Sequence, residues 1–139
     1  MVDEGTLDAL RGMLGYTDSQ WDKWKSNDRN MKVAENLSEY YKYKLVAEVT
    51  SSNGCAVQHK VGDRIVFGTV ALACKESPDQ ICYGLLLPII PYVQILFQWI
   101  SNGEKPSSFV FPKVHCVDVG VEHGGWGEVI ADVKVEKIQ

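Results

Sequence analysis

Residues 54–63 read Gly-Cys-Ala-Val-Gln-His-Lys-Val-Gly-Asp, and this stretch organises the interpretation of the whole chain. It places the thiol of Cys55 and the imidazole of His59 four residues apart, and Gly62-Asp63 then leads into the apolar run 64–67. A cysteine and a histidine at this spacing can converge on one point from a loop or from a single helical turn. The stretch therefore predicts a metal site or a thiolate–imidazole pair beside the turn that opens a strand.

The composition is that of a soluble globular protein of one domain. The 139 residues are 45% hydrophobic and 23% charged, enough to bury a core without disulfides. A formal net charge of -4 gives no electrostatic footprint for nucleic acid, so we expect no nucleic-acid partner. Met1 is followed by Val-Asp-Glu and not by an apolar signal region, which favours a cytoplasmic location and four free or ligating cysteines.

The first forty residues carry helical patterns. Residues 6–14 place leucine and methionine at helical spacing before Gly15, and Thr17-Asp-Ser-Gln20 has the pattern of a capping box that starts a second helix. Residues 26–28 break that helix, and residues 31–41 predict a third. Trp21 and Trp24 share one face of the second helix, where a tryptophan pair is more often core or subunit interface than a ligand cage.

The pattern changes to strands at residue 43. Alternating residues 43–49 predict the first strand, 51–54 a turn, 64–67 a second strand, and 129–138 the last. Residues 109–112 are a short extended piece, and in 114–118 alternation puts Cys116 and Asp118 on the same side.

One uncharged run of twenty residues, 81–100, is near the length that spans a bilayer. Pro88 and Pro91 lie in its middle, Gln94 and Gln98 interrupt it, and neither flank carries a lysine or arginine cluster, so we expect a core helix and no membrane partner. Residues 77–80 are its expected N-terminus, with Cys82 in the first turn, where the helix dipole favours a thiolate. The two prolines predict a short helix, a bend and a second helix over 91–99.

These elements predict an α+β fold of one domain over residues 1–139. N-terminal helices in a 1–42 extension precede a 43–139 body, which holds a small antiparallel β-sheet or partly open barrel and one central kinked apolar helix. Because the tryptophans need a partner surface, we expect the extension to pack on the body or on a neighbouring subunit, and the chain to be a homo-oligomer.

The order of Cys55, His59, Gly62-Asp63, then Cys82 before the apolar helix, then Cys116-x-Asp118, resembles a family of small prokaryotic proteins of unassigned function. Members of that family open with G-x-C-x-x-x-H-x-x-G-D and carry a C-P-D motif near the end. The resemblance covers residues 43–138. Gly54 directly precedes Cys55, and Val117 stands where the family tends to have proline. The resemblance implies a set of positions and no reaction.

Four of these positions could bind a metal. Cys55, His59, Cys82 and Cys116 make a three-sulfur, one-nitrogen set suited to zinc or another thiophilic metal, although no pair has C-x-x-C spacing. The alternative is that the cysteines are buried and pack as small hydrophobes, as we expect for Cys74. His115 and His123 are substitutes for His59 if that ring points away.

Three hypotheses for function follow. The first is a metal-dependent enzyme acting on a small molecule, with Asp118, Glu122 or His123 as the acid–base partner. The second is a non-catalytic binding or assembly protein with structural cysteines. The third is a metal-free thiol enzyme with Cys55 or Cys82 as nucleophile and His59 as base. The glycine-rich residues 122–127 lack the G-x-G-x-x-G order of a dinucleotide-binding loop.

Overall fold

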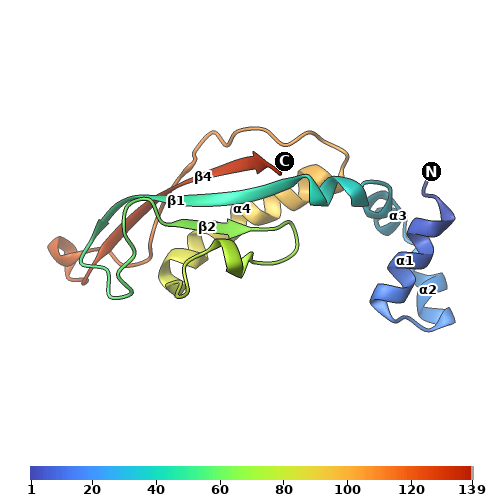
Figure 1. The fold of residues 1–139 in the computed structure, drawn as a ribbon, viewed down its shortest axis with the longest axis horizontal. Coiled ribbons are helices and arrows are strands. Elements are labelled where there is room, and N and C mark those ends of the chain that lie inside the picture. Colours follow the sequence, from blue (N-terminus) through green and yellow to red (C-terminus); the bar gives the residue numbers. More distant parts are fainter. Residues whose placement is uncertain (139) are drawn as a thin grey trace.

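A computed structural model describes residues 1–138 and shows three N-terminal helices joined to an α+β body (Figure 1). The elements follow in this order: α1 (Glu4–Leu14), α2 (Asp18–Lys25), α3 (Asp28–Glu35), the 3-10 turn η1 (Leu37–Tyr41), β1 (Tyr43–Asn53), β2 (Arg64–Phe67), η2 (Cys74–Glu76), α4 (Tyr83–Ser101), β3 (Lys113–His115), η3 (Val121–His123) and β4 (Glu128–Lys137). The predicted α+β class is confirmed.

The four strands form one open antiparallel sheet in the order β2-β1-β4-β3. The two long strands β1 and β4 are its centre, and their register runs from Tyr43 opposite Lys137 to Asn53 opposite Glu128. The predicted turn over residues 51–54 is wrong, because β4 supplies partners for Ser51, Ser52 and Asn53 and thereby keeps them extended. The chain leaves the sheet at Gly54, which has a φ of 68° that suits glycine.

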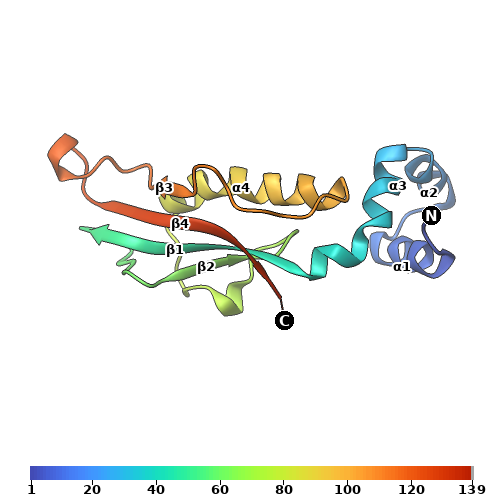
Figure 2. The same cartoon turned by 90° about the horizontal axis from the view of Figure 1, so that it is seen from above.

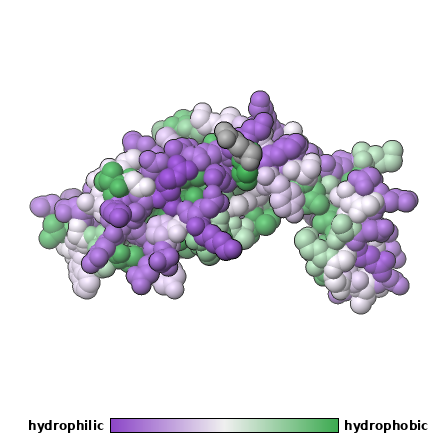
Figure 3. Space-filling model, in the orientation of Figure 1, coloured by the Kyte–Doolittle hydropathy of each residue, from purple (hydrophilic) through white to green (hydrophobic). Residues whose placement is uncertain are grey.

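Helix α4 lies across one face of this sheet and encloses the main core (Figure 2). The helix contributes Leu85, Ile89, Leu96 and Ile100, and the sheet contributes the alternate residues that face it: Leu45, Ala47, Val49, Ile65, Phe67, Val114, Val129, Ala131 and Val133. The opposite face of the sheet carries the ion pairs of Arg64 with Glu48 and Glu136, and Figure 3 shows this side as largely hydrophilic.

The predicted division of the apolar segment into two helices is wrong, because residues 83–101 form one continuous helix. Pro88 has no N–H for the carbonyl of Gly84 one turn earlier, but the backbone N–H of Val117 donates to that carbonyl at 2.9 Å. A neighbouring segment thus replaces the missing hydrogen bond. The predicted start over 77–80 is also wrong: the helix begins at Tyr83 with Cys82 as its N-cap.

By length and composition, α4 is the one helix within residues 1–138 that could cross a membrane. In this fold its buried side packs on the sheet, while Tyr83, Leu87, Ile90 and Ile95 lie exposed on its other side.

The N-terminal helices pack on each other and stand at one end of the body (Figure 2). Gly15 ends α1 with a φ of 64°, and the capping box of Thr17 and Gln20 starts α2, both as predicted. Trp21 is buried and stacks on Trp24 with ring centroids 4.9 Å apart. The predicted bounds of the third helix, 31–41, are wrong, since α3 begins at Asp28 and ends at Glu35, and residues 37–41 form the turn η1.

Candidate functional site: a pocket lined by three thiols

Three of the four cysteines line one pocket of about 260 Å³. Cys55 lies in the loop after β1, Cys82 caps α4, and Cys116 follows β3, so three separate segments bring their thiols to the same place. The rest of the wall is mostly apolar: Ala56, Val57, Gly84, Leu85, Val117, Asp118, Gly127 and Val129. Cys74 lies elsewhere, exposed on η2, which corrects its assignment to the core.

Glycines allow these segments to approach closely. A Cβ on Gly84 would lie 2.8 Å from Cγ2 of Val117, and a Cβ on Gly54 would lie 2.8 Å from the carbonyl oxygen of Trp126. A side chain at Gly84 would push the pocket wall at Val117 away, and one at Gly54 would displace the backbone at Trp126, because a Cβ does not pack at such distances. The predicted motif contained Gly54, but nothing local in the sequence marked Gly84, whose role depends on Val117 thirty-three residues later.

His59 is buried and fixes the loop of residues 54–63 to the start of α4. The backbone N–H of Cys82 donates to Nε2 of His59 at 3.1 Å, so this nitrogen carries no proton of its own. The proton therefore lies on Nδ1, which faces Oδ2 of Asp63 at 3.4 Å. Both ring nitrogens are engaged, and His59 does not line the pocket.

The four predicted ligands do not form a metal site in this arrangement. Within residues 1–138 no group of three or more His, Cys, Asp or Glu side chains is placed to hold an ion. The Nε2 lone pair of His59 is already used, and Sγ of Cys116 accepts the N–H of Val129 at 3.3 Å. The residues present therefore do not fit a three-sulfur, one-nitrogen zinc centre.

Asp118 lies at the pocket but holds a loop together. Its carboxylate accepts the backbone N–H groups of Gly120, Trp126 and Gly127 at 2.9–3.1 Å. These hydrogen bonds, with that of Gly127 the strongest, lower the pKa of Asp118. An ionised carboxylate that is already saturated with donors is a poor proton donor at neutral pH, which weakens its predicted acid–base role.

The other two predicted acid–base residues lie away from the thiols. Glu122 and His123 are on η3 and line a second hollow of about 250 Å³ beside Trp126. His115, the other substitute ligand, points its Nε2 towards Glu128 at 3.3 Å. The carbonyl of Cys116 and then Glu128 raise the pKa of His115. The structure therefore separates Glu122 and His123 from the pocket that Asp118 adjoins.

Comparisons with protein-family models, with curated proteins and with solved structures find no match to this chain. The resemblance of residues 43–138 to the small prokaryotic family stays a prediction. The candidate site is therefore interpreted from its own chemistry.

Proposed function

We propose that this chain is a non-catalytic binding protein that holds a small apolar molecule in the thiol-lined pocket. The observation that carries the proposal is the combination of an apolar wall with three free thiols and no free base. Asp118, which lines the pocket, and His59, which accepts the amide of Cys82, are both occupied by backbone amides.

The volume of the pocket and its lining of sulfur atoms and apolar side chains indicate the class of ligand. About 260 Å³ lies just below the usual range for drug-sized ligands, which suits a compound of one or two rings. Sulfur makes favourable contacts with aromatic rings, and the side chains of Val57, Leu85 and Val129 offer apolar surface on the same wall.

Competition between a ligand and a thiol reagent tests this proposal. The three pocket thiols and the exposed Cys74 are alkylated with N-ethylmaleimide, with and without indole or other one- and two-ring compounds, and each site is followed by mass spectrometry. We expect a bound compound to slow alkylation of Cys55 and Cys82 while leaving Cys74 unchanged. If no compound in the panel slows the pocket thiols relative to Cys74, the proposal fails.

A matched pair of variants gives the control. Ala56→Phe fills the pocket from an exposed position on its rim and should abolish the protection. Ala71→Phe makes the same change at an exposed alanine outside the pocket and should leave it intact. Equal protection in both variants would place the compound somewhere else.

A thiophilic metal such as zinc is the second candidate, and the gathering of Cys55, Cys82 and Cys116 around one pocket favours it. Binding would require His59 to release the amide of Cys82, or the three thiols to move together without it, because within residues 1–138 no three such side chains are placed to hold an ion. A Zn²⁺ titration followed by calorimetry tests this: Cys74→Ser should retain binding, and Cys116→Ser should lose it. A metal-dependent enzyme, or a thiol enzyme with His59 as base, would need the same release.

A further inference from the structure

The free edge of β4 lies beside the largest hollow described on this molecule. Strand β3 pairs with β4 only at residues 130–132, and the N–H of Val133 then donates to the carbonyl of Pro112 at 2.7 Å. Beyond that point β4 continues to Lys137 and is paired with β1 alone. Four residues of a central strand thus have an uncovered side.

The alternation of a strand tells which backbone groups lie on that side. Because the N–H of Val133 points towards Pro112, the N–H groups of Val135 and Lys137 point the same way. Among residues 1–138, no backbone group outside the β1 ladder accepts from either of them. An edge with free amides and carbonyls is a template for another extended segment.

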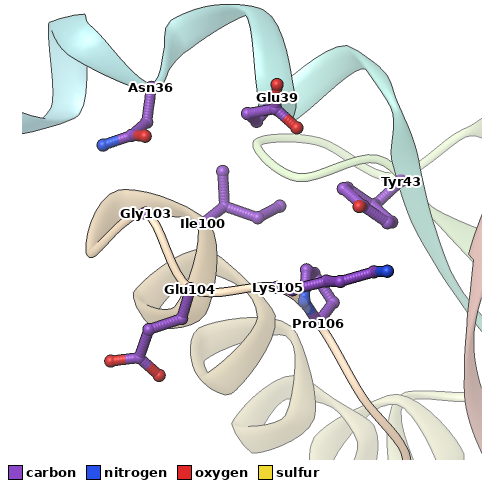
Figure 4. A pocket seen from close by; sticks show the side chains of 8 residues that line it. All are labelled: Asn36, Glu39, Tyr43, Ile100, Gly103, Glu104, Lys105 and Pro106. Carbon is purple, nitrogen blue, oxygen red and sulfur yellow. The ribbon is translucent and has the colours of Figure 1, made fainter.

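A groove runs along this edge, which we call the edge groove. It has a volume of about 600 Å³ and lies between β4 and the loop of residues 105–112. Its apolar surface comes from Tyr43, Pro106, Phe109, Pro112, Val133 and Val135. It continues into a second hollow of about 340 Å³ that shares Tyr43, Lys105 and Pro106. Figure 4 shows this continuation, with Lys105 and Pro106 across from Asn36 and Glu39.

The outer wall of the edge groove is fixed before anything binds. Phe109 stacks on Trp99 at 5.3 Å between centroids and meets the ring of Tyr92 edge-on at 4.8 Å. The hydroxyl of Tyr92 donates to the carbonyl of Phe111, and the N–H of Glu104 donates to the carbonyl of Trp99. The loop is therefore held against α4 at both ends and in its middle, so binding costs little ordering.

We propose that the edge groove binds an extended peptide, which adds to the sheet as a strand beside residues 134–137 of β4. The groove is bounded by β4 on one side and by residues 105–109 on the other, which favours a single inserted strand over the edge of a second folded sheet. Lys105 and Lys137 line the groove and make no ion pair within residues 1–138, whereas Lys134 pairs with Glu48 and Glu136. The one carboxylate of the groove, Asp132, pairs with Lys113. The peptide is therefore acidic, with apolar side chains alternating between carboxylates.

Selection from a random peptide library tests the proposal without assuming a sequence. The full chain is the bait, and enriched peptides are measured by fluorescence polarisation. We expect acidic, alternating sequences whose affinity falls about tenfold in Val135→Pro, because that variant removes one edge N–H. Val135→Thr keeps the N–H and a β-branched side chain, and should stay within about twofold of the original affinity.

Charge reversal and hydrogen exchange supply two further readouts. Lys105→Glu should weaken the acidic peptides, and Lys75→Glu, an exposed lysine on η2, should not. In the unmodified chain, bound peptide should slow amide exchange at Val135 and Lys137, while Lys134 and Glu136, which already face β1, stay unchanged. Because hydrogen exchange is measured in the unmodified chain, it does not depend on whether a variant folds.

Three results would overturn the proposal. They are a library that yields no binder, peptides that bind Val135→Pro as well as the unmodified chain, and binders that leave exchange at Val135 unchanged. Concentration-dependent self-association that protects the same two amides would instead make a second copy of this chain the occupant, and would equally refute the peptide.

Discussion

Gly84 is a residue of α4 whose lack of a side chain leaves room for Val117. An alanine in its place would normally stabilise a helix by about 1 kcal/mol. Here its Cβ would meet Cγ2 of Val117 at 2.8 Å, so the segment that carries Val117 or the helix must move. We expect Gly84→Ala to destabilise the protein in urea unfolding.

The same change in a Val117→Ala background should have the opposite sign, because the clashing methyl is gone. A coupling of about 1–2 kcal/mol between the two sites is expected. Additive effects would contradict the close packing at this point.

Asp118 makes the loop of residues 119–127 sensitive to acid. Its pKa is lowered by the amides of Gly127, Gly120 and Trp126, so folding favours the ionised form. The stabilisation is complete above the unfolded pKa and is lost as the pH falls through the lower folded value. We expect the amides of Trp126 and Gly127 to lose protection from exchange in NMR spectra as the pH falls below the ordinary aspartate value of 3.8.

Asp118→Asn is the matched variant. Its amide group turns a donor towards backbone donors, so the loop should be loosened at neutral pH and show no further change over the acid range. An unchanged acid transition in this variant would assign the effect to another carboxyl group.

At the scale of elements, His59 joins the loop after β1 to the N-terminus of α4. Removing the buried ring leaves the partly buried N–H of Cys82 without its acceptor and opens a small cavity. We expect His59→Ala to lower the free energy of unfolding by about 2–4 kcal/mol, measured by urea denaturation. His59→Gln can still present an acceptor and should cost less. A loss equal in both variants would mean that packing, and not the hydrogen bond, matters.

Elements whose bounds are decided by nearby residues could be predicted from the sequence, and elements whose bounds depend on distant residues could not. The end of α1 at Gly15, the capping box of α2 and strand β2 were predicted correctly, because each is decided by residues within one turn or one strand. The continuity of α4 was not predicted, since the N–H that replaces the one missing from Pro88 comes from Val117. The extension of β1 through residues 51–53 likewise depended on β4.

In the candidate site, likewise, the positions of the residues could be predicted and their hydrogen-bond partners could not. Cysteine and aspartate positions were visible in the sequence, and three of the cysteines do line one pocket. The engagement of His59 with an amide and of Asp118 with its own loop could not be predicted, because residue spacing does not tell which backbone donors will reach a side chain.

At the scale of the whole molecule, residues 1–138 form two hydrophobic clusters of unequal size. The smaller one centres on Leu10, Trp21 and Ala34 in the N-terminal helices, and Leu37 touches both clusters. Trp21→Ala should lower the free energy of unfolding of the N-terminal helices by about 3–5 kcal/mol, which is enough to unfold so small a cluster. We expect α1–α3 to lose amide protection while β1 and β4 keep theirs in hydrogen-exchange mass spectrometry. Simultaneous loss in both regions would show that they unfold as one unit.

The position of β4 at the centre of the sheet has a consequence for the order in which the chain is made. β1 and β4 pair along their length, with one irregularity between Val49 and Ser51, but are separated by more than seventy residues of chain. On the ribosome, β1, β2 and α4 emerge before the strand that joins them to β3, so one backbone edge of β1 waits without the strand that pairs with it. Synthesis of the last strand is therefore the step that commits this protein to its fold, and a pause before residue 128 would hold the nascent chain in its most aggregation-prone state.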